Sequence, residues 1–89
     1  REALTVIENG LRGLVWALRY FPDRAGPQIE VLRTALDADR TKIEQGAPFV
    51  LERLQMADRH LVTLSKAAAT ADADERFDLA WEVEYALDY

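Results

Sequence analysis

Apolar residues recur every three or four positions along four stretches of this chain, and the spacing predicts four helices. Residues three or four apart lie on one face of an α-helix, so these side chains are expected to face a common core. We predict helices over residues of about 3–21, 27–45, 48–69 and 73–87. In the first stretch the apolar positions are Leu4, Ile7, Leu11, Leu14, Leu18 and Phe21.

The breaks between the stretches carry residues that end or begin helices. Pro22 is expected to end the first helix, because the residue before a proline avoids the α region. Pro27 and Pro48 suit the first position of the second and third helices, and Gly46 suits the C-terminal cap of the second. Asp72 is the expected N-cap of the fourth helix.

The other three stretches have apolar positions of the same kind. In the second they are Ile29, Leu32, Leu36 and Ile43; in the third Val50, Leu54, Ala57, Leu61, Leu64 and Ala68; in the fourth Phe77, Ala80, Trp81, Val83 and Leu87. Two acids, Asp39 and Glu84, fall among them. We expect each to turn to the edge of the bundle and pair with an arginine, the alternative being that they border a polar pocket.

Short connections favour neighbouring helices that lie side by side. The predicted fold is therefore all-α: a single small domain of 89 residues forming an antiparallel up-down-up-down four-helix bundle. A bent pair of helices across the short link at residues 46–48 is the alternative for the second and third helices.

Charge is concentrated at one end of a chain whose net charge is −5. Residues 72–89 carry seven acids against one base, Arg76, while the rest of the chain is close to neutral. An acidic chain repels the phosphate backbone, so direct nucleic-acid binding is disfavoured. A local acidic field instead favours a basic protein partner.

Several classes of protein are disfavoured by what the chain lacks. It has no cysteine, and none of its apolar runs approaches the roughly 18 residues of a membrane span. We expect a cytoplasmic protein that does not enter a membrane. No metal-ligand or phosphate-binding motif stands out, so no cofactor and no metal are expected.

The back of the first helix has an unusual composition for a solvent-facing surface. Asn9, Gly13, Trp16 and Tyr20 fall opposite the leucine positions, with Arg12 beside them. Aromatic residues next to arginine are typical anchors of protein interfaces. We interpret this face as a dimer or partner interface. The alternative is that the first helix is central and packed on both sides.

The fourth helix offers a second candidate surface. Asp74, Asp78 and Glu82 form a stripe of like charge at intervals of four, bordered by Tyr85. Like charges at this spacing repel unless a cation lies opposite. We interpret the stripe as a docking face for a basic partner, the alternative being a solvated acidic face.

The single histidine, His60, does not lie in a recognisable catalytic motif. A phosphotransfer domain carries Lys three residues after its phosphorylated His, and Thr63 stands there in this chain, so the pattern fails. We expect an ordinary surface or boundary histidine.

The sequence therefore predicts a protein–protein interaction module, a regulatory, adaptor or assembly subunit rather than an enzyme. It would bind a second copy of itself, a basic protein, or both. Two alternatives stay open. One is a small helical enzyme or phosphorelay module using His60, and the other is a binder of a small apolar ligand between helices, lined by Phe77, Trp81 and Met56.

Overall fold

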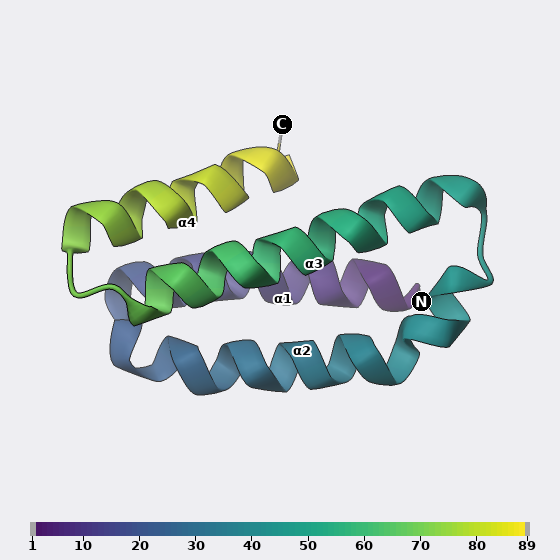
Figure 1. The fold of residues 1–89 in the computed structure, drawn as a ribbon, viewed down its shortest axis with the longest axis horizontal. Coiled ribbons are helices and arrows are strands. Elements are labelled where there is room, and N and C mark those ends of the chain that lie inside the picture. The colour runs from purple at the N-terminus through teal and green to yellow at the C-terminus, as the bar shows by residue number, and fades with distance from the viewer. Residues whose placement is uncertain (1, 89) are drawn as a thin grey trace.

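Four helices account for almost all of the chain in the computed structural model, which describes residues 2–88. They are α1 (Ala3–Tyr20), α2 (Pro22–Glu44), α3 (Pro48–Ala69) and α4 (Ala73–Asp88). Within those residues no strand is present, so the predicted all-α class and single small domain are confirmed. Figure 1 shows the helices side by side, each running roughly parallel to the long axis of the molecule and joined to the next by a short connection.

α1 and α3 are the central helices of the bundle. Each packs against the other three helices, whereas α2 and α4 make no contact with each other within the described residues. The core is filled by aliphatic side chains and alanines, most of them from the predicted positions. Its buried members are Leu4, Ile7, Leu11, Leu14, Val15, Leu18, Ala25, Ile29, Leu36, Ile43, Leu54, Ala57, Leu61, Leu64, Ala67, Ala80 and Val83.

The start of α2 differs from the prediction. The helix begins at Pro22 rather than Pro27, so Phe21 alone separates it from α1, and Pro27 lies inside α2. A proline normally excludes helical geometry at the preceding residue because its ring meets that residue's Cβ. The preceding residue here is Gly26, which has no Cβ, so this clash is relieved, and the helix continues although Pro27 has no N–H to donate to the carbonyl of Asp23. The early start also brings Ala25 into the core, where it is fully buried.

The remaining helix ends agree closely with the sequence. α3 has the predicted bounds, and α4 is one residue longer than predicted. Asp72 caps α4 as expected, because its Oδ1 accepts hydrogen bonds from the backbone N–H groups of Asp74 at 2.9 Å and Glu75 at 3.4 Å. At the end of α2, however, the C-cap is Gln45 rather than Gly46, and no glycine in the described residues has a positive φ.

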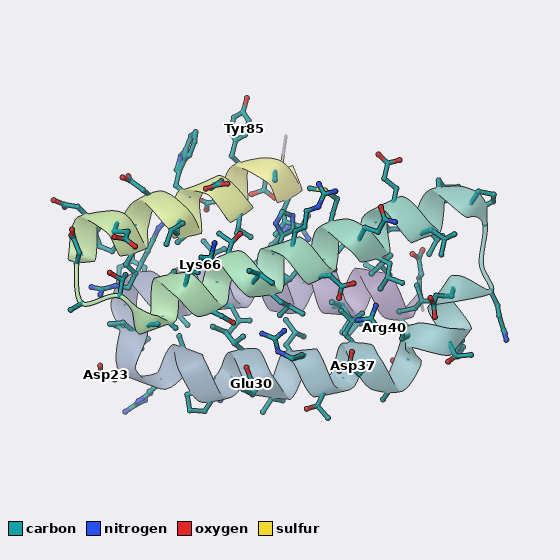
Figure 2. The ribbon with its side chains drawn as sticks, in the orientation of Figure 1. Asp23, Glu30, Asp37, Arg40, Lys66 and Tyr85 are labelled. Atoms are coloured by element: carbon teal, nitrogen blue, oxygen red, sulfur yellow. The ribbon has the colours of Figure 1, made fainter. Side chains whose placement is uncertain are left out.

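Arginines connect most neighbouring helices across their seams. Arg40 on α2 donates to both carboxylate oxygens of Asp58 on α3, at 2.7 and 3.0 Å, and also reaches Asp37 (Figure 2). These carboxylates raise the pKa of Arg40, chiefly through the hydrogen bond to Asp58. Arg53 on α3 holds Glu8 on α1 in the same two-pronged way.

The seam between α1 and α2 is built differently. Within residues 2–88 no ion pair crosses it. Instead the side chain of Leu32 on α2 packs directly against the backbone of Gly10 on α1, where an added Cβ would come within 2.7 Å of Leu32 Cδ1. This seam is therefore held by apolar packing.

Candidate functional site

The aromatic residues of the described chain all lie on the surface. Tyr89 falls outside residues 2–88, and each of the other seven is between 46% and 65% exposed. The prediction that Phe21, Phe77 and Trp81 face the core is wrong. Aliphatic side chains fill the centre, and on α4 only Ala80 and Val83 are buried. The exposed aromatics are Trp16, Tyr20, Phe21, Phe49, Phe77, Trp81 and Tyr85.

Three of these rings form a cluster at the end of α1. Trp16 and Tyr20 are 56% and 59% exposed, with their ring centroids 4.7 Å apart, and Phe21 lies 5.8 Å from Trp16. Asn9 and Gly13 are exposed on the same helix. α1 packs against three helices, as the alternative expected, and the predicted face is still open to solvent, so its role as an interface stays a prediction.

Arg12 belongs to the edge of this face rather than to its centre. Its guanidinium donates to Asp88 Oδ1 at 3.0 Å and to the carbonyl of Leu87 at 3.2 Å, both on α4, and to Asn9 Oδ1 at 3.0 Å. The predicted interface arginine thus also fastens the end of α4 to α1.

The two glycines of α1 have different surroundings. Gly10 lies against Leu32, so its missing side chain is explained by the contact with α2. An added Cβ at Gly13 would meet nothing within 4 Å. A glycine in a helix interior is less favourable than alanine by roughly 1 kcal/mol. Packing inside the bundle does not account for that cost at Gly13.

A shallow apolar groove continues this face from α1 onto α2. Its lining carries no charged side chain, and it includes Val31, which is 64% exposed. The α2 side of this groove is not among the residues that the sequence pattern indicated as an interface. The signal that could have indicated it is Val31 itself, an apolar residue on the polar side of α2. The lining residues are Gly10, Gly13, Leu14, Ala17, Gln28, Val31, Leu32 and Ala35.

The acids of α4 divide into two groups. Glu84 pairs with Arg19 on α1 at 2.7 Å, as predicted for a carboxylate at the edge of the bundle, and Asp88 pairs with Arg12. Asp39, which was expected to behave like Glu84, makes no ion pair within the described residues. The acids facing α1 are therefore neutralised.

The acids on the outer side of α4 are not neutralised. Asp74, Asp78 and Glu82 are exposed, and no ion pair to them is present within residues 2–88. Arg76, the base of this segment, forms no ion pair with them, and its Nε is buried and without a hydrogen-bond partner in the described chain. The predicted acidic stripe is thus a surface of uncompensated negative charge.

Aromatic rings lie beside this acidic stripe. Trp81 stacks on Tyr85 with ring centroids 5.0 Å apart and planes 25° apart. Both residues are more than half exposed, and Figure 2 shows Tyr85 projecting from α4 away from the other helices. The outer face of α4 therefore combines negative charge with a flat apolar surface.

The expectation that His60 is a surface or boundary residue is wrong. Its side chain lies in the interior, with the residue only 6% exposed. Burial lowers the pKa of His60, and the charges of Glu8 and Glu82 oppose the shift only in part. A phosphorelay histidine must reach a phosphodonor, so this burial argues against that role.

The suggested apolar ligand site is not assembled as predicted. Met56 lines a hollow beside His60, whereas Trp81 lines a separate shallow depression formed by α4 alone. Phe77 lines neither of them. Phe77 and Trp81, four residues apart, share the outer face of α4, whereas Met56 lies on α3 beside the hollow.

The described residues show neither a metal site nor a membrane-spanning helix. Among residues 2–88 no group of three or more His, Cys, Asp or Glu side chains is placed to hold a metal ion. None of the described helices has the length and apolar character needed to cross a membrane.

Comparison with protein-family models, curated proteins and solved structures found no match. Any functional argument therefore rests on the residues themselves.

Proposed function

We propose that this protein is a protein–protein interaction module, a regulatory, adaptor or assembly subunit without catalytic activity of its own. It binds through two surfaces. The α1 surface consists of Asn9, Gly13, Trp16 and Tyr20, with Arg12 at its edge. The α4 surface consists of Asp74, Asp78, Glu82 and Tyr85. The cysteine-free composition supports a cytoplasmic setting.

One observation carries the proposal: an aliphatic core combined with solvent-exposed aromatics. An aromatic side chain buries about 150–250 Å² when it is fully enclosed. A ring left half exposed therefore leaves roughly 100 Å² for a partner to cover, worth about 2 kcal/mol at 25 cal/mol per Å². Trp16, Tyr20 and Phe21 together offer such a gain at one place.

The proposal takes the four helices as an antiparallel up-down-up-down bundle. Figure 1 supports this arrangement, because the three connections alternate between the two ends of the molecule. In such a bundle the outer strips of α1 and α4 are continuous surfaces along the long axis, which suits them to side-on docking.

For the α1 surface we propose a second copy of the chain as the partner. The face and the adjoining groove contain no acidic side chain, so two copies can meet there without bringing like charges together. A two-fold symmetric contact uses the same patch on both subunits, which an uncharged patch with a close-approach glycine permits. Gly13, which has open space in place of a side chain, is the expected point of nearest approach.

For the α4 surface we propose a basic protein. Its outward acids have no partner within the described chain, and bringing a cationic helix against them would relieve their mutual repulsion. The stacked rings of Trp81 and Tyr85 give that partner an apolar anchor. Charge would then govern the rate and specificity of binding, and the rings its strength.

The α1 surface is tested by molar mass in solution, measured by light scattering over a wide dilution range. We expect a dimer that dissociates on dilution, and we expect Trp16→Glu to give a monomer with unchanged helical content. Phe49→Glu is the matched control, because Phe49 is equally aromatic and 65% exposed but lies outside both surfaces. A wild-type protein that is monomeric throughout, or a Trp16→Glu variant that still dimerises, would rule out the α1 interface.

The α4 surface is tested separately with a lysine-rich amphipathic helical peptide as the probe. Binding should weaken as salt shortens the Debye length from roughly 30 to 8 Å, and Asp78→Lys should weaken it further. Glu44→Lys, an equal charge change at an exposed position on α2, serves as the control. Salt-independent binding, or equal effects of the two variants, would contradict the docking role of α4.

A further inference from the structure

A hollow opens where α4 ends short of its neighbours. Figure 1 shows the C-terminal end of α4 above the middle of α3, so the first half of α3 extends beyond it. The hollow there has a volume of about 370 Å³ and is walled by α1, α3 and the last turn of α4. That volume lies within the range of sites that enclose small molecules, roughly 300–1,000 Å³.

The strongest indication of a ligand is the histidine in its wall. His60 lines the hollow, is only 6% exposed, and is the buried polar residue of the described core. Hydrogen bonds of the described residues do not include one to its imidazole, and its ring nitrogens are not among the fully enclosed polar atoms that lack a partner, so they remain accessible from the hollow. Ligand sites typically combine an apolar lining with a few such polar groups. A ligand in the hollow can therefore hydrogen-bond to the imidazole.

The charges around the hollow determine which ligand charge is favoured. Arg53 is already engaged, by both oxygens of Glu8 and by Glu2 at 2.6 Å. Glu52 also lines the hollow, is exposed, and makes no ion pair within the described chain. The wall therefore carries a surplus of negative charge. His60 adds no compensating charge near neutral pH, since burial lowers its pKa.

The remaining wall is apolar and adaptable. Leu11 from α1, Met56 from α3 and Leu87 from α4 face the hollow, and Phe49 lies at its rim. Methionine adjusts to irregular shapes, and an aromatic face attracts a nearby cation. The hollow thus offers an apolar enclosure, one unpaired imidazole and an acidic margin.

We propose that this hollow is a binding site for a small primary amine with an apolar body, such as an arylalkylamine. The apolar body lies against Leu11, Met56 and Leu87, a polar atom of the ligand pairs with His60, and the ammonium group lies toward Glu52. This site is separate from both proposed protein-binding surfaces and does not depend on them.

The proposal is tested with three probes of the same shape: phenylpropylamine, phenylpropanol and phenylpropanoate. Because the chain has a single histidine, the imidazole signal of His60 can be followed by NMR without ambiguity. We expect saturable shifts of that signal with the amine, binding about 5–10-fold weaker with the alcohol, and no binding of the carboxylate. Absence of saturable shifts into the millimolar range, or equal binding of all three probes, would overturn the proposal.

Two variants locate the site. His60→Phe removes the hydrogen-bonding group and should weaken amine binding by about 10-fold. Glu52→Gln changes an exposed residue and leaves folding intact, so it tests the charge argument on its own. It should abolish the preference for amine over alcohol, whereas Glu75→Gln, at an exposed position on α4, should preserve it. An unchanged preference in Glu52→Gln would disprove the assignment of an amine.

Discussion

α1 and α4 both present aromatic rings to solvent, yet the bundle holds the two helices in different ways. α1 buries six side chains and packs on three helices, whereas α4 buries only Ala80 and Val83 and packs on two. α4 is fastened in addition by the ion pairs of Arg12 with Asp88 and of Arg19 with Glu84. One exposed face thus belongs to a helix that is as well anchored as any in the described chain, and the other to the least anchored helix.

The difference shows how a small bundle can divide structural and binding roles. A helix with many buried contacts opens only when the whole domain unfolds, while a lightly anchored helix opens locally at lower free energy. A partner on the α1 surface would meet a rigid platform. A partner on the α4 surface would meet an element whose position depends on a few contacts and on salt.

The largest effect on the free energy of unfolding is expected from truncating a buried side chain on α1 or on α4. Leu11→Ala on α1 should lower the free energy of unfolding by about 3 kcal/mol, because it leaves a cavity in a site that is fully buried. Val83→Ala on α4 removes fewer atoms and should cost about 1–2 kcal/mol. Thermal unfolding followed by circular dichroism measures both. Equal losses would contradict the unequal anchoring of the two helices.

Alanine substitutions at the two glycines of α1 compare an open position, Gly13, with a crowded one, Gly10. Gly13→Ala should raise the stability of the monomer by about 1 kcal/mol, or roughly 4–8 °C in Tm, because the added methyl meets open space. Gly10→Ala should gain less, since Leu32 must move away. If the α1 surface is a dimer interface, Gly13→Ala should also weaken dimerisation. A variant that is both more stable and equally dimeric would remove Gly13 from the interface.

Removing an ion pair of α4 should speed the local opening of this helix and change the free energy of global unfolding only slightly. Arg19→Gln removes a pair whose side chains are 27% and 39% exposed, so its effect should be about 0.5 kcal/mol. Amide hydrogen exchange should accelerate in α4 and stay nearly unchanged in α2. Arg59→Gln, at an exposed position with no ion pair in the described chain, is the control. Uniform acceleration in all helices would show that α4 does not open on its own.

The dependence of the free energy of unfolding on pH tests the burial of His60 on α3. Burial lowers the pKa of His60 below its usual value of about 6.5, so the unfolded chain takes up a proton first as the pH falls. The free energy of unfolding should therefore decrease from pH 7 downward through this region, until the folded-state pKa is reached. His60→Phe should flatten the curve between about pH 7 and 5.5, above the usual range of the carboxylates. A flat wild-type curve would contradict the burial of a neutral imidazole.

The sequence predicted the helices because their signals are local. The apolar spacing of α1 and α3 and the cap at Asp72 depend only on residues close together in the chain, and the structure confirms them. The start of α2 was missed because two rules compete there. Pro27 suits a helix start, but Gly26 before it removes the clash that would end an earlier helix.

The surfaces were predictable in part for the same reason. Periodicity placed Trp16 and Tyr20 opposite the core, and both are exposed. It could not show that Phe77 and Trp81 face outward, because an apolar arc on α4 does not reveal how many helices will cover it. The burial of His60 was missed for the same reason, because the hollow that this side chain lines is formed by three helices.

The sequence by itself determined the number of helices, most of their ends, the aliphatic stripe that each contributes and the acidic character of the last segment. These properties follow from spacing, capping and charge within a few residues. Only the tertiary structure decided which apolar arcs are covered, which acids find an arginine, and where α4 ends relative to α1 and α3. Those outcomes depend on contacts between residues far apart in the chain, which no local pattern encodes.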